Sequence, residues 1–251
     1  MNLSSSNLRM SGITKVINTK NIISDVTFEV PKGRIVGFLG PNGAGKTTTM
    51  HIAAGLSRPT TGEVWIGEIL MNNNWKKAKE HISFIPDYPM LYDELTGEEY
   101  IRFTRDLFKL RVTERELAKE VVKFQLEADF KKRIKHYSLG NKKKLVLLAS
   151  LLRQPSLLLL DEYISGLDPM NSILVRSILT EYAANNGSIL LSTHQLEVAE
   201  KFCDEFILIQ DGCIVDSTSL EEVLEHNSSL ETYFVDQVQR ARNISGKGGS
   251  T

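Results

Sequence analysis

The sequence predicts an α/β fold in which a helical segment is inserted between two halves of a core that contains a sheet. Short apolar runs, such as the four leucines at 157–160, are typical of parallel strands buried on both faces. Stretches with apolar residues at helical spacing follow several of these runs. The region 87–152 is different, because it is charged, has apolar residues at helical spacing and contains no strand signal.

The first half of the predicted core can be followed from the N-terminal side. Residues 22–30 alternate apolar and polar side chains, as a half-buried strand does, and 34–40 form a short apolar run that ends in glycine. A glycine-rich loop then leads into a helical stretch at 50–56. Two more strands are expected at 62–70, interrupted by a glycine, and at 82–86, ended by a proline.

The second half of the core follows the helical region. The sequence predicts, in order, a buried strand at 156–162, a helix at 171–187, a buried strand at 188–194, a helix at 195–204 and a hairpin at 206–216. The hairpin turn is expected at Asp211 and Gly212, a pair that two-residue turns favour. The end of the chain, 243–251, is rich in glycine and serine and is expected to be a flexible tail.

Composition excludes several classes of protein. The formal net charge of -1, from 30 basic and 31 acidic residues, argues against a nucleic-acid-binding protein. The two cysteines, Cys203 and Cys213, are too few for a disulfide framework and lack zinc-site spacing. The chain has no run of 18 apolar residues and no apolar leader at its start, so we expect it to reach a membrane only through a partner.

A phosphate-binding loop is predicted where the second strand gives way to a helix. Residues 40–47, GPNGAGKT, match the pattern G-x-x-x-x-G-K-[ST]. Glycines let successive N–H groups point at phosphate oxygens, and the helix start adds donors and a favourable dipole. Lys46 would reach the β- and γ-phosphates, and Thr47 would place a hydroxyl on Mg²⁺. The alternative is a glycine-rich turn before a helix, but a chance match to this pattern is rare, roughly one in a hundred, and the strand-loop-helix context makes it rarer.

Two carboxylates end the buried strand at 156–162. Ligands of open α/β sheets bind at the carboxyl ends of the strands, which is where Asp161 and Glu162 are expected. Asp161 could bind Mg²⁺, mostly through water, and Glu162 could accept a proton from an attacking water molecule. The alternative is a pair of surface carboxylates without a catalytic role. The phosphate-binding loop in the same chain favours the catalytic interpretation.

A second polar stretch, SLGN at 138–141, precedes an apolar helical run and is followed by Lys142, Lys143 and Lys144. Polar residues and a glycine before a helix usually act as a cap. Lysines in the first turn are unusual, because the positive end of the helix dipole disfavours cations. The stretch therefore permits two interpretations, a cap with a solvated charge run or a site that meets an anion.

The order GPNGAGKT, SLGN, LLLLDE, SGLD and STH resembles the nucleotide-binding subunit of an ABC (ATP-binding cassette) transporter, over about residues 8–225. The resemblance implies a P-loop NTPase (RecA-like) core with an N-terminal antiparallel β subdomain and an inserted α-helical subdomain. It implies a single ABC ATPase domain at 1–225, with its core at 1–86 and 153–225 and its helical subdomain at 87–152. Residues 226–251 are expected to form a short C-terminal helix and a flexible tail.

The resemblance also assigns site residues, each by its match to a family motif. Catalytic roles are implied for Glu162, His194 and Lys46. Nucleotide contacts are implied for Ile17, Gly40, Pro41, Asn42, Gly43, Ala44, Gly45, Lys46, Thr47 and Thr48. The signature, which would act on the nucleotide of a second subunit, is Ser138, Leu139, Gly140 and Asn141, and the D-loop is Ser165, Gly166, Leu167 and Asp168. The implied metal ligands are Thr47, Asp87 and Asp161.

Several residues depart from the family pattern. Asp87 stands where glutamine is usual after the strand at 82–86, and Ile17 stands where an aromatic residue often stacks on adenine. Tyr163 and Ile164 replace the usual proline and threonine after the acidic pair, and Leu139 and Asn141 replace the commonest glycine and glutamine of the signature.

The function that the resemblance implies is ATP binding and Mg²⁺-dependent hydrolysis by a head-to-tail pair of subunits, either two copies or a heterodimer. The pair would drive a separate transmembrane permease subunit, with export as the expected direction, from the cytoplasmic face of the cell membrane. The alternatives are a soluble ABC ATPase without a transport role and a regulatory cassette with weakened catalysis.

Overall fold

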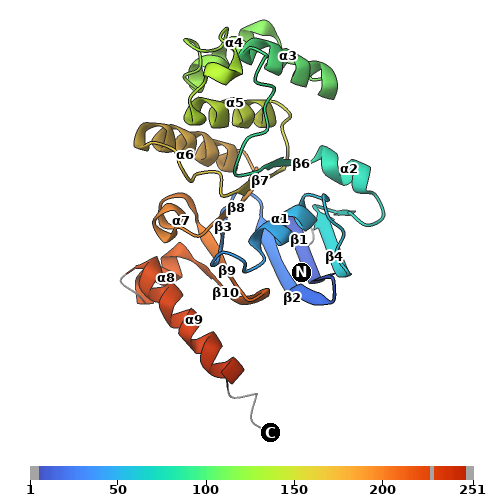
Figure 1. Ribbon diagram of the computed structural model, residues 1–251, viewed down its shortest axis with the longest axis vertical. Coiled ribbons are helices and arrows are strands. Elements are labelled where there is room, and N and C mark those ends of the chain that lie inside the picture. The colour runs from blue at the N-terminus through green and yellow to red at the C-terminus, as the bar shows by residue number, and fades with distance from the viewer. Residues whose placement is uncertain (1–5, 227–228, 247–251) are drawn as a thin grey trace.

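The computed structural model describes residues 6–226 and 229–246, which form two sheets and the helices around them (Figure 1). The strands are β1 Ser6–Ile17, β2 Lys20–Pro31, β3 Ile35–Leu39, β4 Thr61–Ile66, β5 Ile69–Leu70, β6 Ile82–Ile85, β7 Leu157–Asp161, β8 Ser188–Thr193, β9 Glu205–Gln210 and β10 Cys213–Ser219. The helices are α1 Lys46–Ala53, α2 Trp75–Glu80, α3 Gly97–Phe108, α4 Glu114–Lys123, the 3-10 turn η1 Ile134–His136, α5 Leu139–Leu151, α6 Pro169–Ala184, α7 Leu196–Phe202, α8 Leu220–His226 and α9 Leu230–Gly246.

The larger sheet is parallel except at one edge. Its strand order is β10-β9-β3-β8-β7-β6, and only the hairpin strand β10 runs antiparallel to its neighbour. The register pairs Leu39 with Thr193 and Asp161 with Ser192. The carboxyl ends of β3, β7 and β8 therefore meet at one edge, which is where ligands bind in sheets of this kind.

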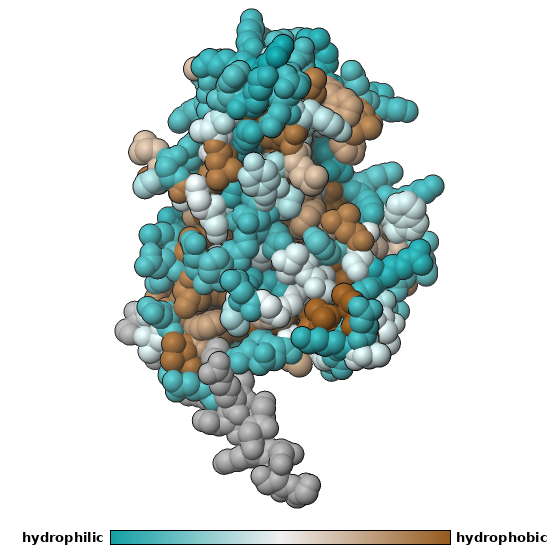
Figure 2. Space-filling model, in the orientation of Figure 1, coloured by the Kyte–Doolittle hydropathy of each residue, from teal (hydrophilic) through white to brown (hydrophobic). Residues whose placement is uncertain are grey.

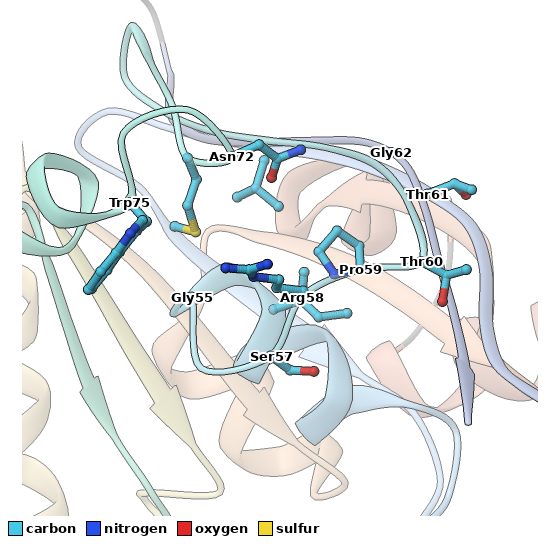
Figure 3. Close-up of a pocket in the computed structure, with 12 residues that line it drawn as sticks. Gly55, Ser57, Arg58, Pro59, Thr60, Thr61, Gly62, Asn72 and Trp75 are labelled. Atoms are coloured by element: carbon cyan, nitrogen blue, oxygen red, sulfur yellow. The ribbon is translucent and has the colours of Figure 1, made fainter. Parts of the chain in front are cut away.

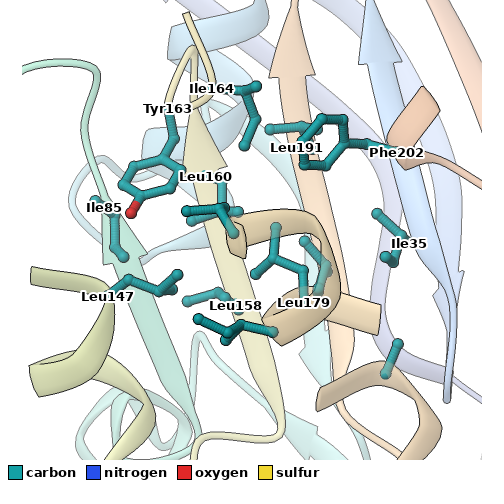
Figure 4. Close-up of a cluster of buried hydrophobic side chains, with 14 of the residues drawn as sticks. Ile35, Ile85, Leu147, Leu158, Leu160, Tyr163, Ile164, Leu179, Leu191 and Phe202 are labelled. Atoms are coloured by element: carbon teal, nitrogen blue, oxygen red, sulfur yellow. The ribbon is translucent and has the colours of Figure 1, made fainter. Parts of the chain in front are cut away.

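Two apolar clusters cover the two faces of this sheet. Along β7, Leu158 and Leu160 belong to one cluster and Leu157 and Leu159 to the other, because successive strand side chains point to opposite faces. The first cluster extends to α5, α6 and the turn after β7, where Tyr163 is fully buried (Figure 4). Burial on both faces explains why the strands read as continuous apolar runs.

The smaller sheet, with strand order β2-β1-β4-β5, is the expected antiparallel part of the fold. Its strand β1 was not predicted from its own pattern, because register shifts on both sides of Gly12 break the alternation of apolar and polar residues. The predicted strand at 62–70 is two strands, which Gly67 joins with a positive φ of 53°. Helix α2 was also missed, since only Ala78 of its six residues is buried.

The helical region between β6 and β7 contains α3, α4 and α5, which lie together at the upper end of Figure 1. Thr96 and Thr113 begin α3 and α4, each with a reciprocal capping box to a glutamate three residues later. The α/β class with a helical insertion and an antiparallel sheet is thus confirmed. The domain boundaries given above stay predictions.

The C-terminal segment differs from expectation in one respect. Helix α9 continues to Gly246, so the prediction of a flexible tail is wrong for residues 243–246. The remainder of the predicted tail, 247–251, lies outside the described residues.

Candidate active site

The carboxyl ends of three neighbouring parallel strands bring the principal candidate residues together. The loop after β3 leads into α1, whose first residue is Lys46. Glu162 follows β7 directly, and His194 follows β8. Lys46 Nζ lies 3.6 Å from Glu162 Oε1, and His194 Nδ1 lies 3.0 Å from Glu162 Oε2. The glutamate carboxylate is therefore held between the two other side chains.

The loop at 40–45 has the backbone that a phosphate-binding loop requires. Gly43 and Gly45 adopt positive φ values of 82° and 105°, and a Cβ atom on Gly45 would lie 2.5 Å from Ile23 Cγ2. Lys46 is buried, and its Nζ donates to the carbonyl oxygens of Gly40 at 2.7 Å and Pro41 at 3.2 Å. The ammonium group thus lies inside the curve of the loop.

The N-terminus of α1 suits an anion. Among the described residues, no side chain caps this helix, and its first turn holds no acidic residue. The first N–H groups of a helix lack intrahelical partners, and the helix dipole favours negative charge there. Phosphate oxygens fit this arrangement.

Glu162 has an unusual backbone conformation for a non-glycine residue, with a φ of 48°. Its N–H group lies 3.1 Å from both the carbonyl oxygen and the hydroxyl of Ser192, and both accept from it. Only 17% of the Glu162 side chain is exposed. Left-handed backbone at a non-glycine residue costs about 1–3 kcal/mol and clusters at functional sites. Ser192 therefore holds the residue in the conformation that turns its carboxylate toward Lys46 and His194.

Asp161 and Thr47 are the pair best suited to a magnesium ion. Asp161 is buried, and one of its oxygens accepts a hydrogen bond from the Ser192 hydroxyl, while Thr47 is exposed in the first turn of α1. Within 6–226 and 229–246, no three His, Cys, Asp or Glu side chains gather as a metal-binding group. A site that depends on one or two protein oxygens, substrate phosphates and water fits Mg²⁺, which rarely takes a full protein cage.

Asp87 follows β6 at the same edge of the sheet, and 66% of its side chain is exposed. Its Oδ1 lies 3.7 Å from Nζ of Lys143 on α5. A role for Asp87 as a metal ligand stays a prediction.

The signature residues form the N-terminal turn of α5. The Ser138 hydroxyl caps the helix by accepting from the N–H of Asn141, and the Asn141 side chain donates to Asp129. Leu139 is 40% exposed. Gly140 is buried, and a Cβ atom there would lie 2.6 Å from Nδ2 of Asn171 in the same chain. The absence of a side chain at Gly140 thus lets Asn171 of the same subunit pack closely against it. Contact of this turn with the nucleotide of a second subunit stays a prediction.

The three lysines after the signature all have partners within the chain. Lys142 forms an ion pair with Asp93 at 2.8 Å. Lys143 and Lys144 are buried and donate to backbone carbonyl oxygens. The interpretation as a solvated charge run is therefore wrong for Lys143 and Lys144, while the interpretation of this turn as a site that meets an anion stays a prediction.

The D-loop residues lie between Glu162 and α6. The Ser165 hydroxyl donates to Glu162 Oε2 at 3.4 Å, and Gly166 has a φ of 77°. Asp168 caps α6 by accepting from the N–H groups of Met170 and Asn171, and its hydrogen bonds to Asn171 lower the pKa of its carboxyl group. Capping accounts for this aspartate within a single subunit, so its role across a dimer interface stays a prediction.

Sequence reasoning missed Ser192, which bonds both carboxylate-bearing residues of the site. No local signal marks this residue, because Ser192 simply ends the apolar run of β8, and its complete burial emerges only from the fold. Buried hydroxyl groups need hydrogen-bond partners, and the adjacent strand end supplies them.

Two of the hollows that lie outside this cluster, in the described part of the chain, border α1 and α3. One, of about 520 Å³, lies beside the C-terminal end of α1 and includes Arg58, Thr60 and Trp75 but none of the predicted site residues (Figure 3). The other is a groove of about 450 Å³ along α3. Its lining includes the exposed large side chains Met90, Tyr92, Phe103, Leu107 and Phe108. Figure 2 shows brown, hydrophobic surface in the upper part of the molecule, the region where Figure 1 places α3.

Comparison with known proteins supplies independent information. A family model described as ABC transporter matches residues 23–165. An uncharacterized ABC transporter ATP-binding protein of Bacillus subtilis, YdbJ, is 34% identical over 85% of this chain and 70% of its own length. The bacitracin transport ATP-binding protein BcrA of Enterococcus faecalis is 31% identical over 94% of this chain and 77% of its own. A solved ATP-binding subunit of an ABC transporter superposes with a TM-score of 0.84 at 30% identity, covering 93% of this chain and all of that one.

No helix in the part of the chain that the structure describes combines the length and the apolar character needed to span a membrane.

Proposed function

The chain belongs to the ABC transporter family of ATP-binding subunits, and on that basis we propose that it hydrolyses ATP with Mg²⁺ to drive a separate transmembrane subunit. The observation that carries the proposal is the Glu162 carboxylate held between Lys46 and His194, beside the phosphate-binding loop. The arrangement supports the proposal because it holds a proton acceptor next to the loop that would bind the phosphates.

The roles of the residues follow from their chemistry. Lys46 and the N–H groups of the loop bind the phosphates, and Thr47 and Asp161 hold Mg²⁺, with Asp87 reaching it directly or through water. The ion, when bound, neutralises charge on the phosphates. Glu162 accepts a proton from the attacking water, and His194 stabilises the charge that develops. Phosphoryl transfer of this kind depends on positioning and electrostatic stabilisation rather than on covalent chemistry.

We propose that two such subunits pair head to tail. Ser138 is exposed at the start of α5. Its hydroxyl and the nearby N–H groups of one subunit would contact the γ-phosphate bound by the other subunit. The pair is either two copies of this chain or a heterodimer.

The proposed contact with the permease is the groove along α3. Met90 and Leu107 in its lining are 89% and 60% exposed, and Pro86, also in its lining, directly precedes Asp87. An exposed apolar groove next to a site residue suits a short amphipathic segment of a membrane protein. The subunit would therefore lie on the cytoplasmic face of the membrane, and the proposed direction is export, as the family resemblance implies.

Replacing Leu107 by glutamate tests this contact. Because the groove is apolar and lies on the helical region, we expect basal ATP hydrolysis to stay within about twofold, while stimulation by the membrane protein encoded by a neighbouring gene falls at least about tenfold. The measurement is ATP hydrolysis by the purified subunit alone and after reconstitution with that membrane protein in lipid vesicles. Leu224→Glu, at a 50% exposed leucine on α8, is the matched control. If the membrane protein stimulates both variants equally, the groove is not its contact site.

Ile17 gives a prediction about base selectivity. It lies at the end of β1 with 46% of the residue exposed, and its contact with adenine stays a prediction. An aliphatic side chain can cover a base but offers no aromatic face, whereas ring stacking contributes about 1–3 kcal/mol per base in single-strand binding systems. We expect Ile17→Tyr to raise the preference for ATP over GTP by about three- to tenfold, measured as the ratio of their dissociation constants. Dissociation constants for ATP and GTP that both equal those of the unaltered chain would exclude contact of residue 17 with the base.

A further inference from the structure

The most unusual buried group outside the cluster described above is the ammonium of Lys143. The residue lies on α5, past the signature turn, and only 1% of it is exposed. Its Nζ donates to the carbonyl oxygens of Tyr163 at 2.8 Å and Ser165 at 2.7 Å. These two carbonyls belong to the turn that begins at Glu162. A buried charge is costly unless it is paired and hydrogen-bonded, and here both conditions are met.

The contact between α5 and this turn is reciprocal. The Tyr163 hydroxyl donates to the backbone carbonyl of Lys143 at 2.8 Å, while the Lys143 side chain bonds the backbone carbonyl of Tyr163. The Lys143 ammonium also lies 5.5 Å from the centre of the Tyr163 ring. The same turn is tied to Glu162, because the Ser165 N–H donates to the Glu162 carbonyl at 3.2 Å. Movement of Lys143 would therefore shift the backbone that carries the proposed base.

The third partner of Lys143 is Asp87, at 3.7 Å. Burial lowers the pKa of the Lys143 ammonium, and the carboxylates of Asp87 and Glu162 oppose that effect. Asp87 and Tyr163 are two of the residues that depart from the family pattern, and both contact Lys143. A glutamine at position 87 could not form an ion pair with the Lys143 ammonium, and a proline at position 163 would have no hydroxyl to donate to the Lys143 carbonyl. The two departures therefore complement each other, because both residues bind Lys143.

We propose that Lys143 is a positioning residue for ATP hydrolysis, which fixes the turn at 162–165 and couples Asp87, beside the α3 groove, to Glu162. The inference rests on the proposed function, since it assigns Lys143 a role in setting the base of that reaction. It does not require Lys143 to touch the nucleotide. Its effect should fall on the rate of the chemical step rather than on the affinity for ATP.

The test compares Lys143→Met with Lys144→Met. Methionine keeps a long unbranched side chain but removes the charge and both donors. Lys144 is a matched control, because it is buried on the same helix but donates to the carbonyl of Gln125, away from the turn. We expect Lys143→Met to lower kcat by about ten- to a hundredfold with KM changed less than about threefold, as a slightly misplaced catalytic group does. Lys144→Met should keep kcat within about twofold of the unaltered chain, even if it lowers the unfolding temperature as much as Lys143→Met does.

Two further variants separate positioning from general destabilisation. Tyr163→Phe removes only the hydroxyl that bonds the Lys143 carbonyl and should lower kcat by about two- to fivefold without a change in fold. Asp87→Asn combined with Lys143→Met should lower kcat by less than the product of the two single effects, because both act through one linked group.

The outcomes are distinct. Lack of hydrolysis by the unaltered subunit, alone and with its membrane partner, would overturn the proposed function and this inference with it. If the unaltered subunit is active and Lys143→Met has the same kcat, or loses no more than Lys144→Met, the inference alone is overturned. Independent effects of Asp87→Asn and Lys143→Met would overturn the coupling to Asp87.

Discussion

Replacing Glu162 by glutamine is expected to lower the rate of ATP hydrolysis by about 10²–10⁴-fold, the contribution typical of a positioned general base. Glutamine keeps the size of the side chain and can still hydrogen-bond to His194, which lies 3.0 Å from the carboxylate. It cannot accept the proton of an attacking water. ATP affinity should be equal or higher, because the carboxylate no longer competes with phosphate for Lys46, 3.6 Å away. Single-turnover hydrolysis and calorimetric titration with Mg²⁺-ATP measure the two effects.

The same variant examines the pairing of subunits. With ATP bound and hydrolysis blocked, Glu162→Gln should sediment as a dimer, because the nucleotide stays between the two subunits. Glu181→Gln is a suitable control, since Glu181 forms a surface ion pair with Lys123 on α4 and should affect neither rate nor association. A Glu162→Gln protein that stays monomeric with ATP, where the full complex hydrolyses ATP, would contradict the sandwich arrangement.

The parts of the site predicted well from the sequence are those that local order determines. A strand, a glycine-rich loop and a helix follow one another at 35–53, so the position of Lys46 depends on neighbours in the chain. Glu162 and His194 were predicted at strand ends, and parallel strands bring such ends to one edge. The placement of these three residues could thus be inferred without knowing any side-chain contact.

What the sequence could not reveal depends on packing between distant segments. The lysines after the signature were judged by the helix dipole, which disfavours cations at a helix start. For Lys143 that effect is outweighed by two carbonyl acceptors some 20 residues away and by Asp87 on another element. Ser192 likewise reads as part of an apolar strand until β7 and β8 are placed side by side. Strand β1 shows no regular alternation of apolar and polar residues for a related reason. Its register is set by two partner strands, and bulges interrupt both pairings.

Replacing Lys46 by methionine should remove most of the affinity for ATP. The Lys46 ammonium lies within the curve of the loop, where it is held by the carbonyls of Gly40 and Pro41 and by the Glu162 carboxylate. A triphosphate offers stronger acceptors than these carbonyls, and a hydrogen bond to a charged group contributes about 1.5–3 kcal/mol. Loss of one or two such bonds corresponds to a dissociation constant that is about ten- to ten-thousandfold higher.

Calorimetric titration with Mg²⁺-ATP measures that loss, and thermal unfolding supports it, because ATP stabilises only a protein that binds it. At the same ATP concentration, Lys46→Met should gain a clearly smaller rise in unfolding temperature than the unaltered chain, whereas Lys144→Met should gain the full rise. Lys46→Arg adds a sharper comparison. It keeps the charge, but Lys46 is buried and a guanidinium is larger than an ammonium group. The affinity of Lys46→Arg for ATP should therefore lie between those of Lys46→Met and the unaltered chain. Unchanged affinity in the methionine variant would mean that phosphate binds elsewhere, since no other basic side chain occupies the described part of the loop at 40–47.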